Sequence, residues 1–146
     1  MAHKIKNLEE SDWEKYLDFC GKFVAERQPF FKINEVGTPD KEKSFDGLKH
    51  RFIVLIDDEV VGFFFYWKYS KVGASIGYGL LGETQGQGIG TAMYEHIVMH
   101  AKENGIIELR AYLAVANWRS IVLLCKRGFK VFRETEGHIM VRKRLI

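Results

Sequence analysis

Three glycines alternate with larger residues in the segment Gln85-Gly86-Gln87-Gly88-Ile89-Gly90, which follows an apolar run and precedes an amphipathic stretch. Glycines let the backbone bend sharply and approach a ligand closely, because no Cβ atom stands in the way. A helix that begins near Ile89 would direct unsatisfied main-chain N–H groups and its positive dipole end at this turn. That arrangement binds anions, above all phosphates. The segment therefore predicts a ligand that carries phosphate.

Two other phosphate-binding patterns do not fit this segment. A Walker A loop needs a lysine after its last glycine, and no lysine follows here. A dinucleotide-binding turn lies in a parallel strand-helix-strand unit whose second strand ends in an acidic residue. Glu108 instead stands at the start of the strand that follows. A phosphate- or nucleotide-binding domain of another kind and a plain glycine-rich surface loop stay open as alternatives.

Neither metal chemistry nor a covalent enzyme intermediate is expected. His96 and His100 are four residues apart, but no glutamate follows His96 and no third ligand is placed beside them. Asp57-Asp58-Glu59 is interpreted as a solvated hairpin turn. Cys20 and Cys125 are far apart in sequence, which indicates reduced thiols and a cytoplasmic setting, with a disulfide between them as the open alternative. Neither cysteine belongs to a pattern with histidine, which argues against a covalent intermediate.

Composition predicts one ordinary globular domain over residues 1–146. Of the 146 residues, 47% are hydrophobic and 28% are charged, and the net charge of +3 is too small to argue for a nucleic-acid partner. We expect no membrane association, because the chain shows no leader pattern and the longest apolar stretch, Val60–Trp67, is far too short to span a bilayer.

Hydrophobic periodicity predicts an α/β (α+β) domain with one mixed, mostly antiparallel sheet of about seven strands and about four helices. A capping box of Ser11 and Glu14 is expected to open the first helix, which runs to about Val24. The remaining helices are expected at 40–49, from 89 to about 104, and from the cap Asn117 to about 127; strands are expected at 4–8, 51–56, 60–69, 72–81, 107–115, 130–134 and 138–144.

Aromatic residues gather in the run Phe63–Trp67, where alternate members are expected in the core. The members on the other face, with Phe30 and Phe31, have two interpretations. They either wall a groove for an acceptor or simply pack.

Three segments resemble the GNAT superfamily of N-acetyltransferases. The turn of that family follows Gln/Arg-x-x-Gly-x-Gly/Ala, which Gln85, Gly88 and Gly90 match. Downstream, Asn117-x-x-Ser120-Ile121 and Lys126-x-Gly128-Phe129 resemble the family's helix after the next strand. The segment Ser75-Ile76-Gly77-Tyr78 is similar to the corresponding segment in the branch of the family that acetylates ribosomal proteins and N-terminal amines.

The resemblance implies an acyl-CoA donor, usually acetyl-CoA, as cosubstrate. Its pyrophosphate would bind the main-chain N–H groups from Gln85 to Thr91, and its pantetheine arm would run beside Leu80 and Leu81. A main-chain N–H near Leu81 would bind the thioester oxygen. The implied cofactor-binding residues are Leu80, Leu81, Gln85, Gly86, Gln87, Gly88, Ile89, Gly90, Thr91, Asn117 and Ser120.

The expected acid and base depart from the family pattern. Leu124 follows the segment Ser120–Leu123, at a position where the family commonly has a tyrosine that protonates the thiolate. Tyr112 and Ser120 are the candidate donors in its place, although Tyr112 also fits ordinary ring packing. Glu83 is the candidate base, although a carboxylate beside a turn is often merely solvated. A site poor in bases favours an amine of low pKa, such as an α-amine at about 7.8 rather than a lysine at about 10.4.

The resemblance as a whole implies an enzyme that moves an acetyl group from acetyl-CoA to a primary amine by direct transfer in a ternary complex. The amine belongs to a protein N-terminus, a lysine or a small molecule, and the enzyme is a monomer or a homodimer. The alternative is a non-catalytic acyl-CoA-binding or sensor module, in which Leu124 reflects lost chemistry.

Overall fold

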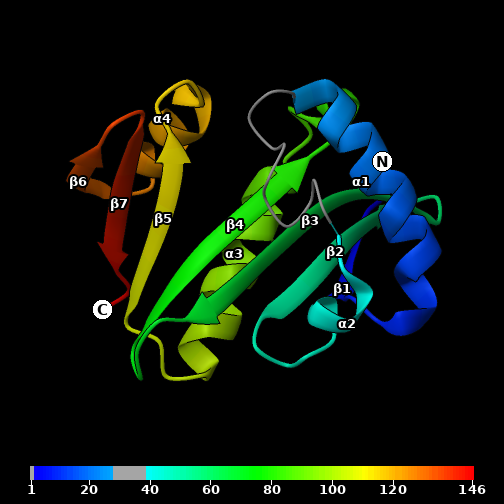
Figure 1. Cartoon of the computed structure of the whole chain (residues 1–146), viewed down its shortest axis with the longest axis horizontal. Helices are drawn as coiled ribbons and strands as arrows, with labels where there is room; N and C mark the ends of the chain where they lie inside the picture. The colour runs from blue at the N-terminus through cyan, green and yellow to red at the C-terminus, as the bar shows by residue number, and fades with distance from the viewer. Residues whose placement is uncertain (1, 28–38) are drawn as a thin grey trace. The chain divides into compact units, whose positions relative to one another are not determined.

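The structure is a computed structural model that describes residues 2–27 and 39–146. The chain divides into two units. The N-terminal unit comprises residues 1–66 and 77–97, and the C-terminal unit comprises residues 67–76 and 98–146. Figure 1 shows the elements in chain order: β1 (Lys4–Asn7), η1 (Glu10–Asp12), α1 (Trp13–Arg27), α2 (Lys41–Ser44), β2 (His50–Ile56), β3 (Glu59–Lys68), β4 (Gly73–Leu80), η2 (Gly82–Thr84), α3 (Ile89–Glu103), β5 (Glu108–Ala114), α4 (Trp118–Lys126), β6 (Lys130–Thr135) and β7 (His138–Arg144).

The strands of the described residues form one seven-stranded sheet in the order β1-β2-β3-β4-β5-β7-β6. β4 and β5 pair in parallel, whereas β1 with β2, β2 with β3, β5 with β7 and β6 with β7 pair antiparallel. The expected α+β class and the expected order of strands and helices are therefore confirmed.

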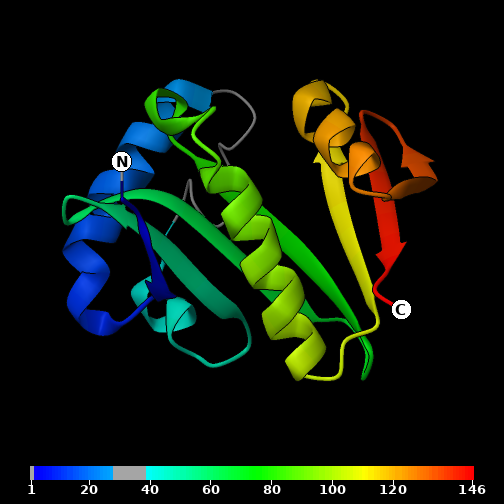
Figure 2. The same cartoon turned by 180° about the vertical axis from the view of Figure 1, so that it is seen from behind.

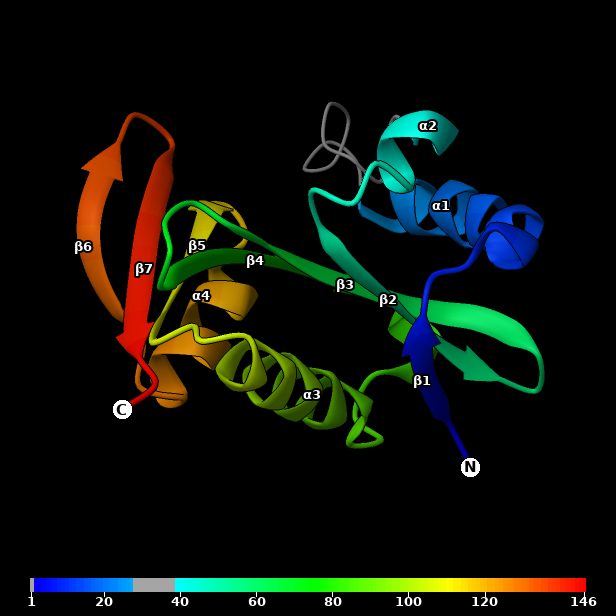
Figure 3. The same cartoon turned by 90° about the horizontal axis from the view of Figure 1, so that it is seen from below.

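In the N-terminal unit, helices cover both faces of the sheet. Figure 3 shows α1 and α2 on one face of these strands and α3 on the other. Tyr16 of α1 packs on Phe63 with ring centroids 5.0 Å apart, while His96 of α3 meets Phe52 edge-on at 4.9 Å. Phe63 and Phe64 point to opposite faces and both are fully buried. Phe63 and Phe64 therefore both pack in the core. The groove-wall interpretation stays a prediction for Phe65 and Trp67, which are half-buried, and Phe30 and Phe31 lie outside the described residues.

In the C-terminal unit, α4 packs against β5 and β7, as Figure 2 shows from behind. The face of β5 that was expected to be apolar carries the buried Leu109 and Ala111, whereas Tyr112 on the other face is exposed. Val141 of β7 and Leu124 of α4 complete this small core.

Two helix boundaries differ from expectation. The capping box at the first helix is made by Glu9 and Asp12, not by Ser11 and Glu14: the Glu9 N–H donates to Asp12 Oδ2 at 2.9 Å, and η1 precedes α1. Asp12 is held there because Lys6 Nζ pairs with its carboxylate at 2.9 Å. The helix expected over 40–49 ends at Ser44, whose carbonyl accepts a hydrogen bond from the buried Arg51 at 2.8 Å.

A polar cluster links the β3–β4 hairpin to β5 in the C-terminal unit. The Tyr69 hydroxyl donates to Glu108 Oε1 at 2.5 Å, and Arg110 Nε donates to the same oxygen at 2.9 Å. The hydrogen bond from Tyr69 has the largest effect on Glu108, and together with the contacts to Arg110 it holds the pKa of Glu108 below its ordinary value. Burial acts in the opposite direction and raises this pKa, but it has the smaller effect. Burial, reinforced by the Glu108 carboxylate, raises the pKa of Tyr69 to about 12.

We expect Tyr69→Phe to lower the free energy of unfolding by about 1 kcal/mol at pH 7, because it removes a hydrogen bond to a charged group at a partly exposed site. A carboxyl whose folded pKa is depressed stabilises the fold above its unfolded pKa and loses this effect as pH falls through the folded pKa. Urea unfolding of both proteins at pH 7 and pH 3 measures the difference, which should shrink at pH 3. An equal difference at the two pH values would contradict the assignment to Glu108.

Candidate functional site

The glycine segment leaves the sheet at the end of β4, in the N-terminal unit. Leu81 is buried, and its N–H donates to the Val61 carbonyl at 2.9 Å. The hydroxyl of the buried Thr84 donates to the Leu81 carbonyl at 2.7 Å, which closes the single turn η2. The segment therefore starts from a fixed point of the core.

Two glutamine side chains fold back onto the turn. Gln85 Nε2 donates to the Leu80 carbonyl at 3.3 Å, and Gln87 Nε2 donates to the Glu83 carbonyl at 3.5 Å. The main-chain N–H of Gln85 donates to the Gly82 carbonyl at 3.2 Å. Gln85 thus braces the turn, and its N–H, which was expected among the phosphate donors, is already engaged.

The glycines are required by the backbone at two of the three positions. Gly86 and Gly88 have φ values of 81° and 79°, in the left-handed region that residues with a Cβ rarely adopt. Gly90 has an ordinary φ and lies in the first turn of α3. A Cβ built on any of the three would meet no atom within 4 Å, so the space over the turn is open.

Five consecutive main-chain N–H groups of this turn are unpaired. Within residues 2–27 and 39–146, the N–H groups of Gly86, Gln87, Gly88, Ile89 and Gly90 donate no hydrogen bond. Ile89 is fully buried and anchors the start of the fifteen-residue α3, whose first turn holds no carboxylate. Unpaired N–H groups at the positive end of a helix dipole form a socket for an anion such as a diphosphate.

The donor expected for a thioester oxygen is not free. The Leu81 N–H is bonded to Val61, and the next N–H, of Gly82, donates to Glu26 Oε1 on α1 at 2.8 Å. Both groups are therefore engaged in the protein itself. No local sequence pattern predicts this role of Glu26, because Glu26 is 56 residues away from Gly82 in the chain.

The C-terminal unit carries the other predicted site residues, at one end of β5. Asn117 occupies the N-cap position of α4, as expected. Its side chain makes no capping hydrogen bond to the helix. Ser120 follows in the first turn of α4 and is half-buried. In the described part of the chain its hydroxyl has no hydrogen-bond partner, which leaves it available to a ligand.

Tyr112 lies against His138, which no motif of the sequence singles out. The rings of Tyr112 and His138 stack with centroids 4.7 Å apart and planes 7° from parallel. His138 is paired with Ala114 at the end of β5, and the Val115 N–H donates to the Gly137 carbonyl at 2.9 Å. The imidazole is thus held at the end of β5 that leads into α4. The Glu136-Gly137 turn indicates the β6–β7 hairpin, but no local pattern predicts that β7 pairs with β5.

Comparison with known proteins now decides the family. The sequence profile of the acetyltransferase (GNAT) family matches residues 4–129, which is most of the chain. The chain belongs to the acetyltransferase (GNAT) family. No curated protein matches the sequence.

Solved structures with the GNAT fold superpose over nearly the whole chain. The GNAT domain of S. lividans PAT is 18% identical, with a TM-score of 0.84 over 97% of this chain and 90% of that one. PaiA N-acetyltransferase from Thermoplasma acidophilum, solved in complex with coenzyme A, is 17% identical, with a TM-score of 0.77 over 99% of both chains. The ribosomal-protein-S18-alanine N-acetyltransferase from Escherichia coli is 18% identical, with a TM-score of 0.75 over 99% of this chain and 94% of that one. At these identities the likeness establishes the fold.

The position that departs from the GNAT pattern has a structural role in this chain. Leu124 is 2% exposed and packs in the core of the C-terminal unit. A leucine there fills apolar space and supplies no proton.

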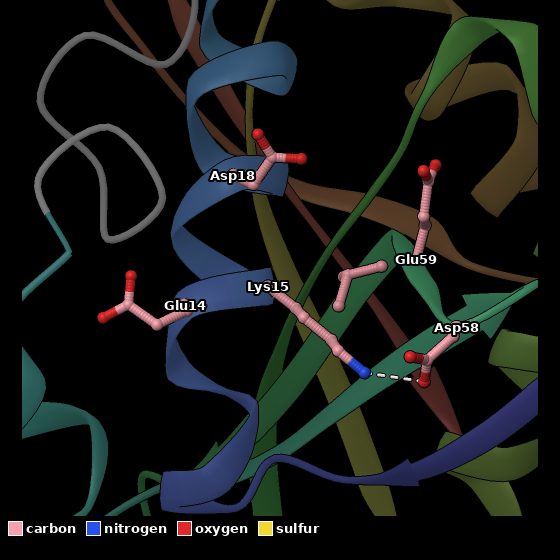
Figure 4. A pocket seen from close by; sticks show the side chains of 6 residues that line it. Glu14, Lys15, Asp18, Asp58 and Glu59 are labelled. Atoms are coloured by element: carbon pink, nitrogen blue, oxygen red, sulfur yellow. Dashed lines mark ion pairs between the residues drawn. The ribbon is translucent and has the colours of Figure 1, made fainter.

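A surface pocket of the N-terminal unit, shown in Figure 4, is a poor site for phosphate. It is lined by four carboxylates, one lysine and one valine: Glu14, Asp18, Asp58, Glu59, Lys15 and Val60. The single cation is already engaged, because Lys15 Nζ pairs with Asp58 Oδ1 at 2.6 Å. The surplus negative charge would repel a phosphate.

Among the described residues, no group of three or more His, Cys, Asp or Glu side chains is placed to hold a metal ion. His96 is half-buried and packs edge-on against the rings of Phe52 and Phe64. Both cysteines are free thiols, Cys20 buried and Cys125 exposed. None of the helices in residues 2–27 and 39–146 is both long and apolar enough to cross a membrane.

Proposed function

We propose that residues 1–146 form one acetyltransferase domain that transfers an acetyl group from acetyl-CoA to a primary amine. The observation that carries this proposal is the set of five unpaired N–H groups from Gly86 to Gly90 at the start of α3. They fit a diphosphate without a metal, because main-chain dipoles and the helix end supply the positive potential. Leu80, Leu81, Gln85 and Thr91 border this socket in sequence, and Gln85 acts as its brace.

Following the family resemblance, we assign the proton transfers to the C-terminal unit. Acetyl-CoA supplies a thioester whose carbonyl an uncharged amine attacks; the amine must lose a proton and the departing thiolate must gain one. His138 is our proton acceptor, since a neutral imidazole nitrogen can take the proton that the attacking amine loses. Tyr112 and Ser120 are the candidate donors to the thiolate, and Asn117 and Ser120 border the pantetheine arm.

Glu83 is a weaker candidate for the base than His138. Its side chain is exposed on η2, where water solvates a carboxylate fully. Glu26 acts as a positioning residue in this proposal, because its carboxylate holds the Gly82 N–H at the end of β4.

Thermal unfolding with and without 1 mM acetyl-CoA, with ATP and NAD as matched phosphate ligands, tests the donor. We expect the midpoint to rise with acetyl-CoA and coenzyme A, by mass action on the folded state, and not with ATP or NAD. Release of free thiol from acetyl-CoA in a panel of amines and N-terminal peptides then tests transfer. A rise in midpoint without thiol release for any amine would favour the sensor alternative, which rests on Leu124. A midpoint unmoved by acetyl-CoA would refute both.

The acceptor is a protein N-terminus, a lysine or a small molecule. The E. coli neighbour named above acts on an alanine of a ribosomal protein, which supports a peptide acceptor. We propose a cytoplasmic setting, which the free thiols of both cysteines support, and a monomer or a homodimer.

A further inference from the structure

A row of three cations crosses three neighbouring strands of the C-terminal unit. Arg110 on β5 is directly opposite Arg142 on β7, and Arg142 is directly opposite Lys130 on β6. Directly opposite residues of antiparallel strands project from the same face of a sheet, so the three charges are nearest neighbours. Like charges in this arrangement destabilise a sheet. The sheet is therefore destabilised locally by repulsion between these three cations, and the pairing of the strands does not itself require cations at these positions.

The row is only partly neutralised from within. Glu108 accepts from Arg110 Nε at 2.9 Å, and Arg144 stands directly opposite Glu108 on β7. Within the described residues, Arg110 forms an ion pair with Glu108, whereas Arg142, Arg144 and Lys130 form none. One carboxylate thus faces four cations, which leaves a surplus of three positive charges.

Aromatic rings hold the two central guanidinium groups in place. Arg110 lies 4.2 Å above the Tyr69 ring and 5.1 Å from the Phe132 ring, and Arg142 lies 4.6 Å above Phe132. Phe132 stands at the bulge of β6, between Val131 and Arg133. Cation–π contacts of this kind orient guanidinium groups while their N–H edges stay free to bind an anion.

The row lies on the exposed face of these strands. Val141, the neighbour of Arg142 on β7, is fully buried on the face where α4 packs, whereas Arg142 is exposed. Lys130 is also exposed, on β6, the last strand of the sheet. A partner can therefore reach the row without rearrangement of the unit.

We propose that this row binds an acidic peptide segment. Adjacent strands are about 4.8 Å apart, so the row spans roughly 10 Å, and carboxylates two residues apart in an extended chain, about 7 Å, fit within it. Single-stranded nucleic acid fits less well, because bases stack on open aromatic faces and both rings here are covered by guanidinium groups.

If the proposed acyl transfer holds, the acidic segment belongs to the acceptor. Arg110 is four residues before Ala114, which pairs with His138, a separation of roughly 13 Å along an extended strand. An extended peptide covers that separation in about four residues. The preferred acceptor would then carry Asp or Glu about four residues from its reactive amine.

Fluorescence anisotropy of a labelled ten-residue peptide with alternating glutamates, in 50 mM salt and without acetyl-CoA, tests the site. We expect binding at least ten times tighter than that of the same peptide with glutamine for glutamate, and a loss of at least tenfold in Arg142→Glu and Lys130→Glu. Lys102→Glu is the matched control, because it makes the same charge change on an exposed residue of α3 and should shift affinity less than twofold. Equal losses in all three variants, or tighter binding of a ten-nucleotide single-stranded RNA than of the peptide, would overturn the proposal.

Two further measurements separate this inference from the proposed function. Arg142→Gln should raise the thermal midpoint, because it relieves repulsion by Arg110 and Lys130. A lower midpoint would refute the premise that the charges of the row repel one another.

In the thiol-release assay, the acidic peptide should show at least a tenfold lower KM than the same peptide with glutamine for glutamate, at similar kcat. Peptide binding without thiol release would leave the acidic site standing and count against acyl transfer to that amine. Equal KM values would overturn the link to the acceptor.

Discussion

The Gly90→Glu variant is expected to fold at least as well as the natural chain and to bind acetyl-CoA at least 100-fold more weakly. Gly90 has an ordinary φ and open space around its Cβ position, so the new side chain strains nothing in the protein. Glycine within a helix costs about 1 kcal/mol relative to good helix formers, and a carboxylate in the first turn gains about 0.3–1 kcal/mol from the helix dipole. The same carboxylate would occupy and repel the diphosphate position. Thermal unfolding and titration calorimetry with acetyl-CoA measure the two effects on one protein sample.

Two matched variants separate the causes of a binding loss. Gly90→Ala should bind acetyl-CoA within a few-fold of the natural chain, because it adds a methyl group and no charge. Gly88→Val should lower the free energy of unfolding by about 1–3 kcal/mol, because valine is strained at a φ of 79°. Natural affinity in Gly90→Glu would show that the diphosphate binds elsewhere.

The His138→Gln variant is expected to lose about 10²–10⁴ in kcat while its affinity for acetyl-CoA stays unchanged. Positioned proton transfer contributes about that factor to enzymatic rates. Glutamine keeps the polarity and much of the volume of the imidazole but cannot accept a proton at neutral pH. A continuous thiol-release assay at pH 7 measures kcat, and titration calorimetry measures the affinity for acetyl-CoA.

His100→Gln provides the control, since His100 is also a half-buried histidine of the C-terminal unit but lies on α3. Its kcat should match that of the natural chain. Tyr112→Phe keeps the ring that stacks on His138 and removes only the hydroxyl. It should lower kcat if Tyr112 protonates the thiolate. A kcat of His138→Gln equal to that of the natural chain would remove His138 from the reaction.

Much of the architecture can be predicted because it depends on short-range patterns. Alternation of apolar and polar residues placed β5 and β7 within a residue of their observed bounds. The glycine turn is predictable for the same reason, because the positive φ values at Gly86 and Gly88 are local demands that only glycine meets cheaply.

The helix boundaries that were wrong depended on distant partners. Asp12 displaces Ser11 from the capping box because Lys6, on β1, holds its carboxylate. α2 stops at Ser44 where the guanidinium of Arg51 reaches back from β2. Local capping patterns contain no information about either cation.

The sequence by itself determined the family, the order of the elements and the place of the glycine turn, since each follows from residues that are neighbours in the chain. Only the tertiary structure decided that His138 stacks on Tyr112, that Glu26 takes the Gly82 N–H, and that Arg110, Arg142 and Lys130 form one row. Those relations depend on strand register and helix docking. Register is chosen by the burial of whole faces at once, and no single segment of the chain carries that choice.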